Sequence, residues 1–353
     1  MRVGVLLSTG ALIAVAAAIF LMSQILPVGM PTASGNAGVG YDVLGPIGAD
    51  GGGDATPFAE IWYPATPDAA PRPVLIYLPG WVGTAIEDVF LIRDLASHGF
   101  VVASVRYPSP ADLATDAGLR GETPDEMDFS SQPAFENTLR LADGKARSRA
   151  RNVTALIDRL MHLSEDANSP VAGRLDLSRI GAWGYSFGGA AAAQAARQDG
   201  RIKAIANLDG WLFAEAAADG VPCPYLSVSD ATPLPDEADL TAPEAQRRYT
   251  AILQRDDYDR QVAGLKRHGG FMLTIDGTNH VNFSDYALRF RSRRLSGTGP
   301  IDPRRALVIT ADYLRGFFDD ALLGHPSALL RDGAAGYPEA HLQIIAASVG
   351  TGL

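Results

Sequence analysis

Cysteine and histidine are scarce in this chain of 353 residues, and their scarcity limits its chemistry. The single cysteine, Cys223, cannot form a disulfide within the chain, so cysteine usage does not indicate an oxidising or a reducing compartment. Six histidines and one cysteine leave little material for a structural zinc site. We therefore expect no metal and no cofactor.

Basic residues are fewer than acidic ones: the chain has 30 Lys and Arg and 40 Asp and Glu, which gives a formal net charge of −10. This balance argues against nucleic acid and against an anionic membrane surface as electrostatic partners. Hydrophobic residues make up 47% of the chain and charged residues 20%, as in a globular protein with a substantial core.

The N-terminus combines a basic start with an uncharged apolar stretch over residues 3–22, followed by a Pro/Gly/Ser-rich segment at residues 27–35. This pattern is typical of an export signal, although the apolar stretch is also close to the roughly 20 residues that span a bilayer. We expect residues 1–37 to be a signal peptide, cut after Gly35 or Ala37, or an uncleaved membrane anchor with its linker. A buried terminal helix is the third alternative. The chain is thus predicted to be exported, in periplasmic or secreted form, with possible membrane association through this segment.

The remaining residues, 38–353, are predicted to form a single catalytic domain. Apolar runs that end at Pro, Gly, Asp or a polar turn predict strands at 58–64, 74–78, 101–105, 180–185, 202–208, 225–228 and 270–275. Helical patterns alternate with them at 91–95, 153–161, 190–196 and 303–323. The alternation predicts an α/β fold, with a mostly parallel central sheet and helices on both faces. Residues 107–145, which are acidic and contain several prolines, are expected to be an irregular insertion over the sheet.

The most informative motif is GYSFGG at residues 184–189. It follows the apolar run IGAW and precedes an alanine-rich helical segment. A serine on a sharp strand-to-helix turn needs small neighbours, because a Cβ there would collide with the adjacent backbone. The motif in this context is the nucleophile elbow of α/β-hydrolases, and it predicts Ser186 as a nucleophile.

A serine hydroxyl needs a base within hydrogen-bond reach, and the base needs an acid to fix its tautomer. His280 follows the last predicted strand, where ligands of such sheets bind, and is the predicted base. Asp209 and Asp230 follow the two preceding strands, and both fit the order Ser, Asp, His. Either aspartate could instead cap a turn. The order of residues alone leaves the acid open between them.

Two backbone N–H groups are expected to form an oxyanion hole. The N–H of Phe187, directly after the nucleophile, is one predicted donor. The second is expected in the Gly-rich turn after the strand at 74–78, from Trp81 or Val82.

Several aromatic side chains are candidates for lining an apolar substrate pocket. They are Trp62, Trp211 and Phe283, together with Trp81. Each could equally belong to the ordinary core.

Four segments in order resemble the secreted, plasma-type platelet-activating-factor acetylhydrolase family. They are IWYPA at residues 61–65, the elbow, LDGWLF at 208–213 and TIDGTNHVNFSD at 274–285. The resemblance runs from about residue 55 to residue 320. It implies calcium-independent release of short or oxidised sn-2 acyl groups from phospholipids.

The same resemblance implies roles for individual residues. It makes Asp209 the acid and the N–H of Trp81 the second oxyanion donor. The chain departs from the family at Tyr185 and Pro79, where the family commonly has histidine. These departures bear on the shape of the acyl pocket.

Two other functions stay open at this point. One is a broad carboxylesterase or polyester hydrolase without a phospholipid preference. The other belongs to a different class, a non-catalytic binding protein that retains the fold, because a fold alone does not determine function.

Overall fold

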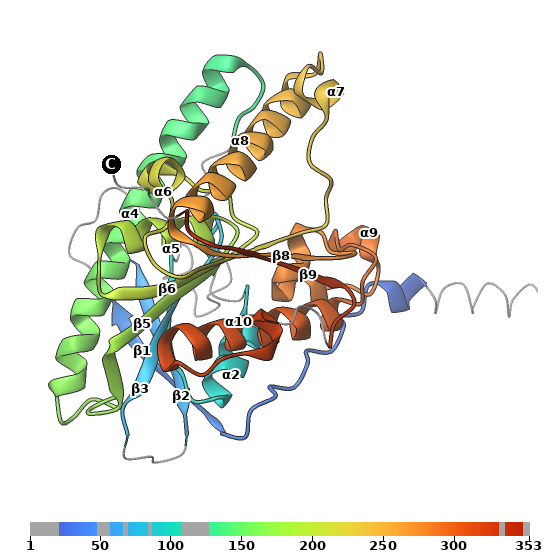
Figure 1. Ribbon diagram of the computed structural model, residues 1–353. Helices are drawn as coiled ribbons and strands as arrows, with labels where there is room; N and C mark the ends of the chain where they lie inside the picture. Colours follow the sequence, from blue (N-terminus) through green and yellow to red (C-terminus); the bar gives the residue numbers. More distant parts are fainter. Residues whose placement is uncertain are drawn as a thin grey trace, which may run out of the picture.

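The computed structural model describes residues 21–47, 57–65, 70–83, 87–107, 127–331 and 336–348. These ranges form one sheet with the strand order β1-β2-β4-β3-β5-β6-β7-β8-β9 (Figure 1). Its strands are β1 (Val39–Pro46), β2 (Phe58–Pro64), β3 (Arg72–Leu78), β4 (Val101–Arg106), β5 (Leu175–Tyr185), β6 (Ile202–Leu208), β7 (Tyr225–Ser229), β8 (Gly270–Ile275) and β9 (Ala340–Ile345). Strands β4, β3, β5, β6, β7 and β8 are parallel, whereas β1, β2 and β9 pair antiparallel at the two edges.

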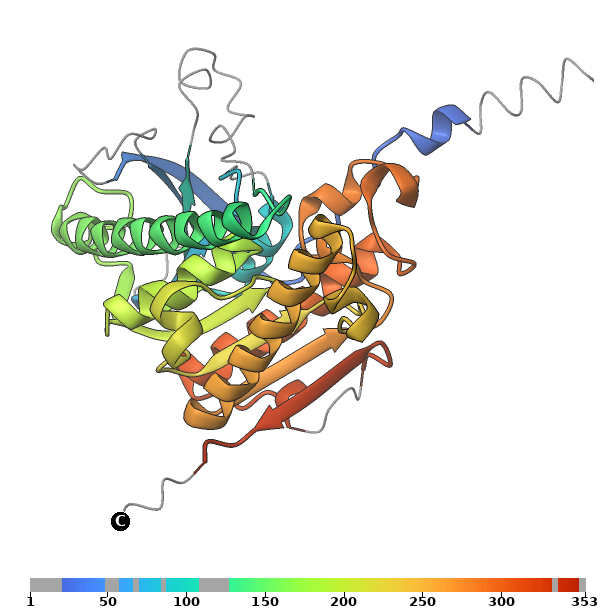
Figure 2. The ribbon, with the colours of Figure 1, turned by 90° about the horizontal axis from the view of Figure 1, so that it is seen from above.

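Helices cover both faces of this sheet (Figures 1 and 2). One face carries α4 (Gln132–Glu165), α5 (Phe187–Gln198), α6 (Ala214–Asp219) and α8 (Ala245–His268), and the other carries α2 (Val89–Ser97) and α10 (Pro303–Leu323). Short helical turns α7 (Glu237–Leu240), η1 (His280–Phe283), η2 (Asp285–Leu288), α9 (Arg293–Ser296) and η3 (Ala328–Leu330) connect them. The predicted α/β-hydrolase fold is therefore confirmed.

Strand β3 shows why the sheet needs cover on both faces. Val74 and Ile76 pack into the apolar cluster under α4 and α5, whereas Leu75 and Tyr77 pack into the cluster under α2 and α10. All four side chains are fully buried. Since successive side chains of a strand point to opposite faces, a continuous apolar run is stable only between two layers of helices.

The prediction of an irregular insertion at residues 107–145 is wrong for the C-terminal part of that segment. Residues 108–126 lie outside the described residues, but α4 begins at Gln132 and continues to Glu165. Ser131 caps the helix by accepting a hydrogen bond from the N–H of Ala134 at 3.3 Å, and Pro133 occupies the first turn. These are helix-start signals, but the sparse apolar residues of the first turns obscured the helical period.

The N-terminal segment that we set apart from the domain is packed against it over its described part. The N–H of Val28 donates to the carbonyl of Leu288 at 2.7 Å, and the N–H of Ala37 donates to the carbonyl of Ser97 at 3.1 Å. The apolar stretch up to residue 20 lies outside the described residues. In the ranges that the structure covers, no helix combines the length and the apolarity needed to cross a bilayer.

The register of the parallel strands sets the position of the site. Leu78 pairs with Gly184, Tyr185 with Leu208, and Leu208 with Val228. The residues that follow β3, β5, β6 and β7 therefore emerge side by side at the carboxyl edge of the sheet, where such folds bind their ligands.

Candidate active site

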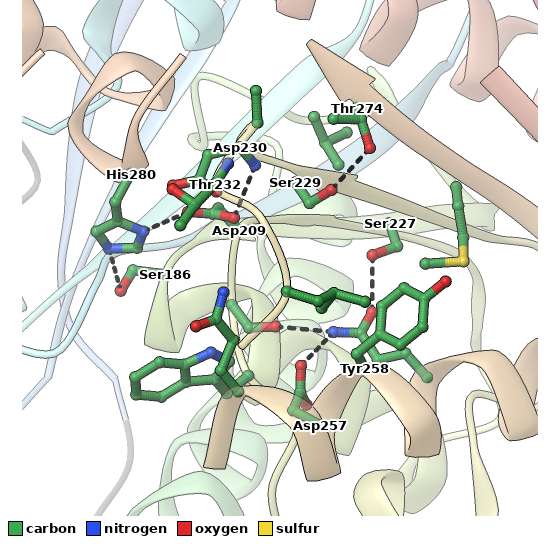
Figure 3. Close-up of a pocket in the computed structure, with 18 of the residues that line it drawn as sticks. Ser186, Asp209, Ser227, Ser229, Asp230, Thr232, Asp257, Tyr258, Thr274 and His280 are labelled. Carbon is green, nitrogen blue, oxygen red and sulfur yellow. Dashed lines mark hydrogen bonds and ion pairs between the residues drawn. The ribbon is translucent and has the colours of Figure 1, made fainter. Parts of the chain in front are cut away.

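The structure joins three of the predicted residues in a chain of hydrogen bonds (Figure 3). Ser186 Oγ lies 3.0 Å from His280 Nε2, and His280 Nδ1 lies 2.6 Å from Asp209 Oδ2. Ser186 follows β5, Asp209 follows β6, and His280 begins the short turn η1 after β8. The three groups thus meet at one edge of the sheet although up to 94 residues separate them in the sequence.

Ser186 has a backbone φ of +54°, which places it in the left-handed region that costs energy for any residue with a Cβ. The elbow accommodates this geometry through its glycines. A Cβ at Gly184 would lie 2.3 Å from the carbonyl carbon of Gly188, and a Cβ at Gly188 would lie 2.0 Å from the carbonyl oxygen of Leu78. Only glycine fits at both positions, so these contacts explain the small residues of the motif.

Asp209 also has a positive φ, of +56°, and its turn is held by side chains. The Asn207 side-chain oxygen accepts the N–H of Gly210 at 3.0 Å, and its amide nitrogen donates to the Gly210 carbonyl at 2.7 Å. A Cβ at Gly210 would lie 2.1 Å from the carbonyl oxygen of Ser186. The turn that carries Asp209 and the elbow that carries Ser186 are therefore in direct contact.

Helix α8 supports the turn that carries Asp209, and our sequence analysis did not predict this helix. Asp257 accepts the N–H of Leu212 at 2.6 Å, and the amide nitrogen of Gln261 donates to the other oxygen of Asp257 at 2.7 Å. Burial raises the pKa of Asp257 to about 7, against the opposing effect of these hydrogen bonds. The helix is charged around most of its circumference and has no clear apolar period, which leaves little signal in the sequence.

The geometry separates the two candidate acids. The N–H of Asp230 donates to Asp209 Oδ1 at 3.0 Å, so Asp230 binds the carboxylate oxygen of Asp209 that is not bonded to His280 (Figure 3). The Asp230 carboxylate accepts hydrogen bonds from the N–H and the hydroxyl of Thr232, each at 2.9 Å. Asp209 thus accepts the hydrogen bond from His280 Nδ1, whereas the Asp230 carboxylate accepts hydrogen bonds within its own turn.

The charge of His280 is set by competing effects. Partial burial favours the neutral ring, but the hydrogen bond and the negative charge of Asp209 outweigh it, and Asp230 and Glu87 add to them. The pKa of His280 is therefore raised above its ordinary value of 6.5. A base must be neutral to accept the serine proton, so this shift sets the acid limit of any reaction at Ser186.

We expect kcat/KM for ester hydrolysis to rise with pH through an apparent pKa above 6.5, because protonated His280 cannot act as a base. Asp230→Asn should move this acid limb to lower pH, since Asp230 contributes to the raised pKa of His280. The measurement is a pH–rate profile of both proteins from pH 5 to 9. An acid limb that stays in place in the variant would contradict this electrostatic assignment.

The turn after β3 lies against the nucleophile, as expected for an oxyanion site. A Cβ added at Gly80 would lie 3.6 Å from the Cβ of Ser186. The Trp81 ring packs edge-to-face on the ring of Phe187, the first residue of α5, with 4.6 Å between centroids. The two residues predicted to supply donors are thus in contact through their rings, and Val82, the alternative donor, follows in the same turn.

A cavity of about 660 Å³ opens onto Ser186 and His280. Apolar side chains from Met127, Phe187, Trp211, Phe213 and Leu234 form part of its wall. Polar groups also line it, among them Gln254. Figure 3 labels others, including Ser227, Ser229, Thr274, Asp257 and Tyr258. The cavity is therefore largely apolar, as expected, with polar groups interspersed in its wall.

Two of the predicted pocket residues lie elsewhere. Trp62 stands on β2, with its ring 4.6 Å from that of Tyr41 on the edge strand β1. Phe283 is fully buried in the core cluster beneath α10, because η1 turns its side chain inward. Of the three, only Trp211 lines the cavity. Within the described ranges, no group of three or more His, Cys, Asp or Glu side chains is arranged to hold a metal.

Comparisons with known proteins agree with this architecture. The family described as "PET hydrolase-like" matches residues 137–263. A "Probable 1-alkyl-2-acetylglycerophosphocholine esterase" from Arthroderma benhamiae is 26% identical over 76% of this chain and 65% of its own length. "Cutinase est1" from Thermobifida alba is 29% identical over 50% of this chain and 46% of its own length. The platelet-activating factor acetylhydrolase of Bos taurus is 24% identical over 62% of this chain and 50% of its own.

The chain therefore spans between about half and two thirds of the length of these curated relatives. Among solved structures, a ferulic acid esterase from Streptomyces cinnamoneus superimposes with a TM-score of 0.64, at 22% identity. The match covers 90% of this chain and 99% of the esterase. At this identity the likeness concerns the fold.

Proposed function

We propose that this chain is a serine hydrolase of carboxylic esters, on the strength of its similarity to platelet-activating factor acetylhydrolase-like α/β-hydrolases. The observation that carries the proposal is the continuous hydrogen-bond chain from Ser186 through His280 to Asp209, opening onto a cavity. A nucleophile, a base and an orienting acid in this order are what acyl transfer through an acyl-enzyme requires.

In the proposed reaction, Ser186 Oγ attacks the acyl carbonyl carbon while His280 Nε2 takes the hydroxyl proton. The carbonyl oxygen becomes an oxyanion that accepts hydrogen bonds from the N–H groups of Phe187 and Trp81. Collapse of this intermediate breaks the ester bond, and His280 passes the proton to the leaving alkoxide. Water, deprotonated by the same histidine, then releases the acid and regenerates Ser186. Asp209 holds the ring in the correct tautomer and stabilises the imidazolium.

For the substrate, we propose a short or oxidised acyl ester at the sn-2 position of a phospholipid. The fungal and bovine relatives bear the names of enzymes for an acetylated glycerophosphocholine and for platelet-activating factor. Three of the four sequence segments that carry this resemblance contribute residues of the site, including Ser186, Asp209 and His280. A calcium-independent reaction is part of the proposal, since each proton transfer in it is assigned to His280 and the oxyanion is assigned to backbone N–H groups.

A polyester or a simple carboxylic ester is the second candidate substrate. The PET hydrolase-like match and the cutinase relative favour it, and Trp211 in the cavity wall offers an aromatic surface. Initial rates on a short-chain phosphatidylcholine, triacetin and an aromatic polyester separate the two. Under the first proposal, kcat/KM is highest for the phospholipid and is unchanged by a calcium chelator. Faster turnover of triacetin or the polyester would overturn the phospholipid preference.

We also propose that the chain is exported and keeps its N-terminal segment. Cleavage after Gly35 or Ala37 would remove residues that pack on the domain, including Val28 and Ser34, whose N–H donates to Asp94 at 2.6 Å. Because cleavage would break these contacts, we favour an uncleaved anchor over a cleaved signal peptide. The intact mass of the protein recovered from membrane and soluble fractions tests this. A mature chain that begins at residue 36 or 38 would refute it.

A further inference from the structure

A buried arginine of α4 binds the backbone of the turn that follows β3. Arg149 is 1% exposed, and its guanidinium donates to three consecutive carbonyls. The distances are 2.8 Å to Pro79, 2.7 Å to Gly80 and 2.9 Å to Trp81. A planar guanidinium has several donors in a fixed arrangement, which suits it to hold successive carbonyls in one orientation.

These contacts determine where the N–H groups of the turn point. In a trans peptide the C=O and the following N–H point in opposite directions. Holding the Gly80 carbonyl toward α4 therefore turns the N–H of Trp81 away from that helix. The preceding N–H, that of Gly80, is bound on the other side by Glu87 Oε2 at 2.6 Å. The orientation of both peptide planes is thus fixed by buried charged side chains.

Arg149 also contacts the second half of the oxyanion site. Its guanidinium carbon lies 5.2 Å from the ring centroid of Phe187 and 4.3 Å from that of Tyr107. Phe187 is the residue after the nucleophile, and its N–H is the other proposed donor. One side chain therefore touches both segments that supply the oxyanion donors.

We propose that Arg149 is a positioning residue that preorganises the oxyanion hole by fixing the peptides of residues 79–81. This inference rests on the proposed ester hydrolysis at Ser186. Preorganised donors act most strongly on the transition state, where the negative charge develops. Loss of Arg149 should consequently lower kcat and leave substrate binding nearly unchanged.

The test compares Arg149→Met and Arg149→Lys with a matched control, Arg159→Met. Arg159 lies on the same helix and donates to a single backbone carbonyl, that of Leu44 in β1, at 2.5 Å. Arg159→Met therefore removes an arginine-to-carbonyl hydrogen bond on the same helix, but away from the site. We expect kcat of Arg149→Met to fall about 100-fold, the effect of losing one oxyanion donor, with KM within about threefold of the unaltered chain. Arg149→Lys should retain part of the activity, because an ammonium carries charge but cannot hold the carbonyls in a planar fork.

A second readout separates positioning from a structural role. The inhibition constant of a trifluoromethyl ketone, which binds as a tetrahedral adduct, should rise by the same factor as kcat/KM falls. Circular dichroism and thermal unfolding identify the folded variants, and if Arg149→Met does not fold, Arg149→Lys carries the test. A folded Arg149 variant with kcat within threefold of the unaltered chain would overturn the inference, as would an equal loss in Arg159→Met. If the unaltered chain hydrolyses no ester, the proposed function fails and this inference fails with it.

Discussion

Ser186→Ala is expected to reduce kcat for ester hydrolysis by about 10⁶-fold, leaving only the residual rate that substrate binding and the oxyanion donors supply. The reason is that Ser186 Oγ is the group within 3.0 Å of His280 Nε2 and the atom that forms the acyl-enzyme. Removal of the hydroxyl leaves no oxygen to accept the acyl group. Hydrolysis of p-nitrophenyl butyrate by the purified protein provides the measurement.

The matched control for this prediction is Ser178→Ala, on the same strand but at its other end. The Ser178 hydroxyl donates to Asp176 at 2.5 Å and is remote from the carboxyl edge of the sheet. We expect it to keep full activity. Ser186→Ala should remain folded, because the hydroxyl contributes little to packing. Activity above about one per cent in a folded Ser186→Ala protein would contradict the assignment of the nucleophile.

Asparagine at position 209 is expected to lower kcat by about 10⁴-fold. Asp209 Oδ2 accepts the hydrogen bond of His280 Nδ1 at 2.6 Å and raises the pKa of the ring. An amide nitrogen at this position would donate to Nδ1 and so favour the tautomer that carries its proton on Nε2. A protonated Nε2 cannot accept the proton of Ser186. Rates on the same ester, corrected for the fraction of folded protein, provide the comparison.

Asp230→Asn serves as the control for the acid. Its backbone N–H still donates to Asp209 Oδ1, and the side chain at position 230 makes its hydrogen bonds with Thr232. We expect a change in kcat of less than about tenfold at pH 8. The opposite outcome, with a large loss in Asp230→Asn and little in Asp209→Asn, would transfer the role of the acid to Asp230.

The meeting of Ser186 and His280 could be predicted from the sequence because the elbow is a local motif and the histidine follows a recognisable strand. The glycines around Ser186 follow from contacts below 3 Å to the neighbouring backbone, which leave no room for a Cβ. The strands β3, β5 and β6 are buried on both faces over most of their length and therefore appear as continuous apolar runs. The position of His280 after the last parallel strand then brings it to the same edge as Ser186.

The choice of acid and the walls of the cavity depend on non-local geometry. Asp209 and Asp230 follow adjacent parallel strands, and only the three-dimensional turn shows which carboxylate faces His280. Helix α8 contributes Asp257 through a buried contact, but its sequence is too charged to indicate a core-facing helix. Trp62 was assigned to the pocket by residue type alone, but its strand β2 lies next to the edge strand β1, with β4 and β3 between it and β5.

The antiparallel edge strands and the start of α4 were missed for related reasons. Strand β1 contains two glycines and a proline and buries only Leu44, so it lacks the apolar run of a central strand. Strand β9 buries only Ala340. The first turns of α4 have few apolar residues, and the cap at Ser131 is their clearest signal.

The central claim is that Ser186 is an activated nucleophile in an ester hydrolase. Intact-mass spectrometry after treatment with a fluorophosphonate tests it most directly, since such a probe phosphonylates an activated serine. The account predicts one adduct per chain, located at Ser186 by peptide mapping, absent from Ser186→Ala and formed much more slowly in Asp209→Asn. A folded protein that takes up no probe would favour a non-catalytic binding protein. An adduct at another residue would contradict the proposed site.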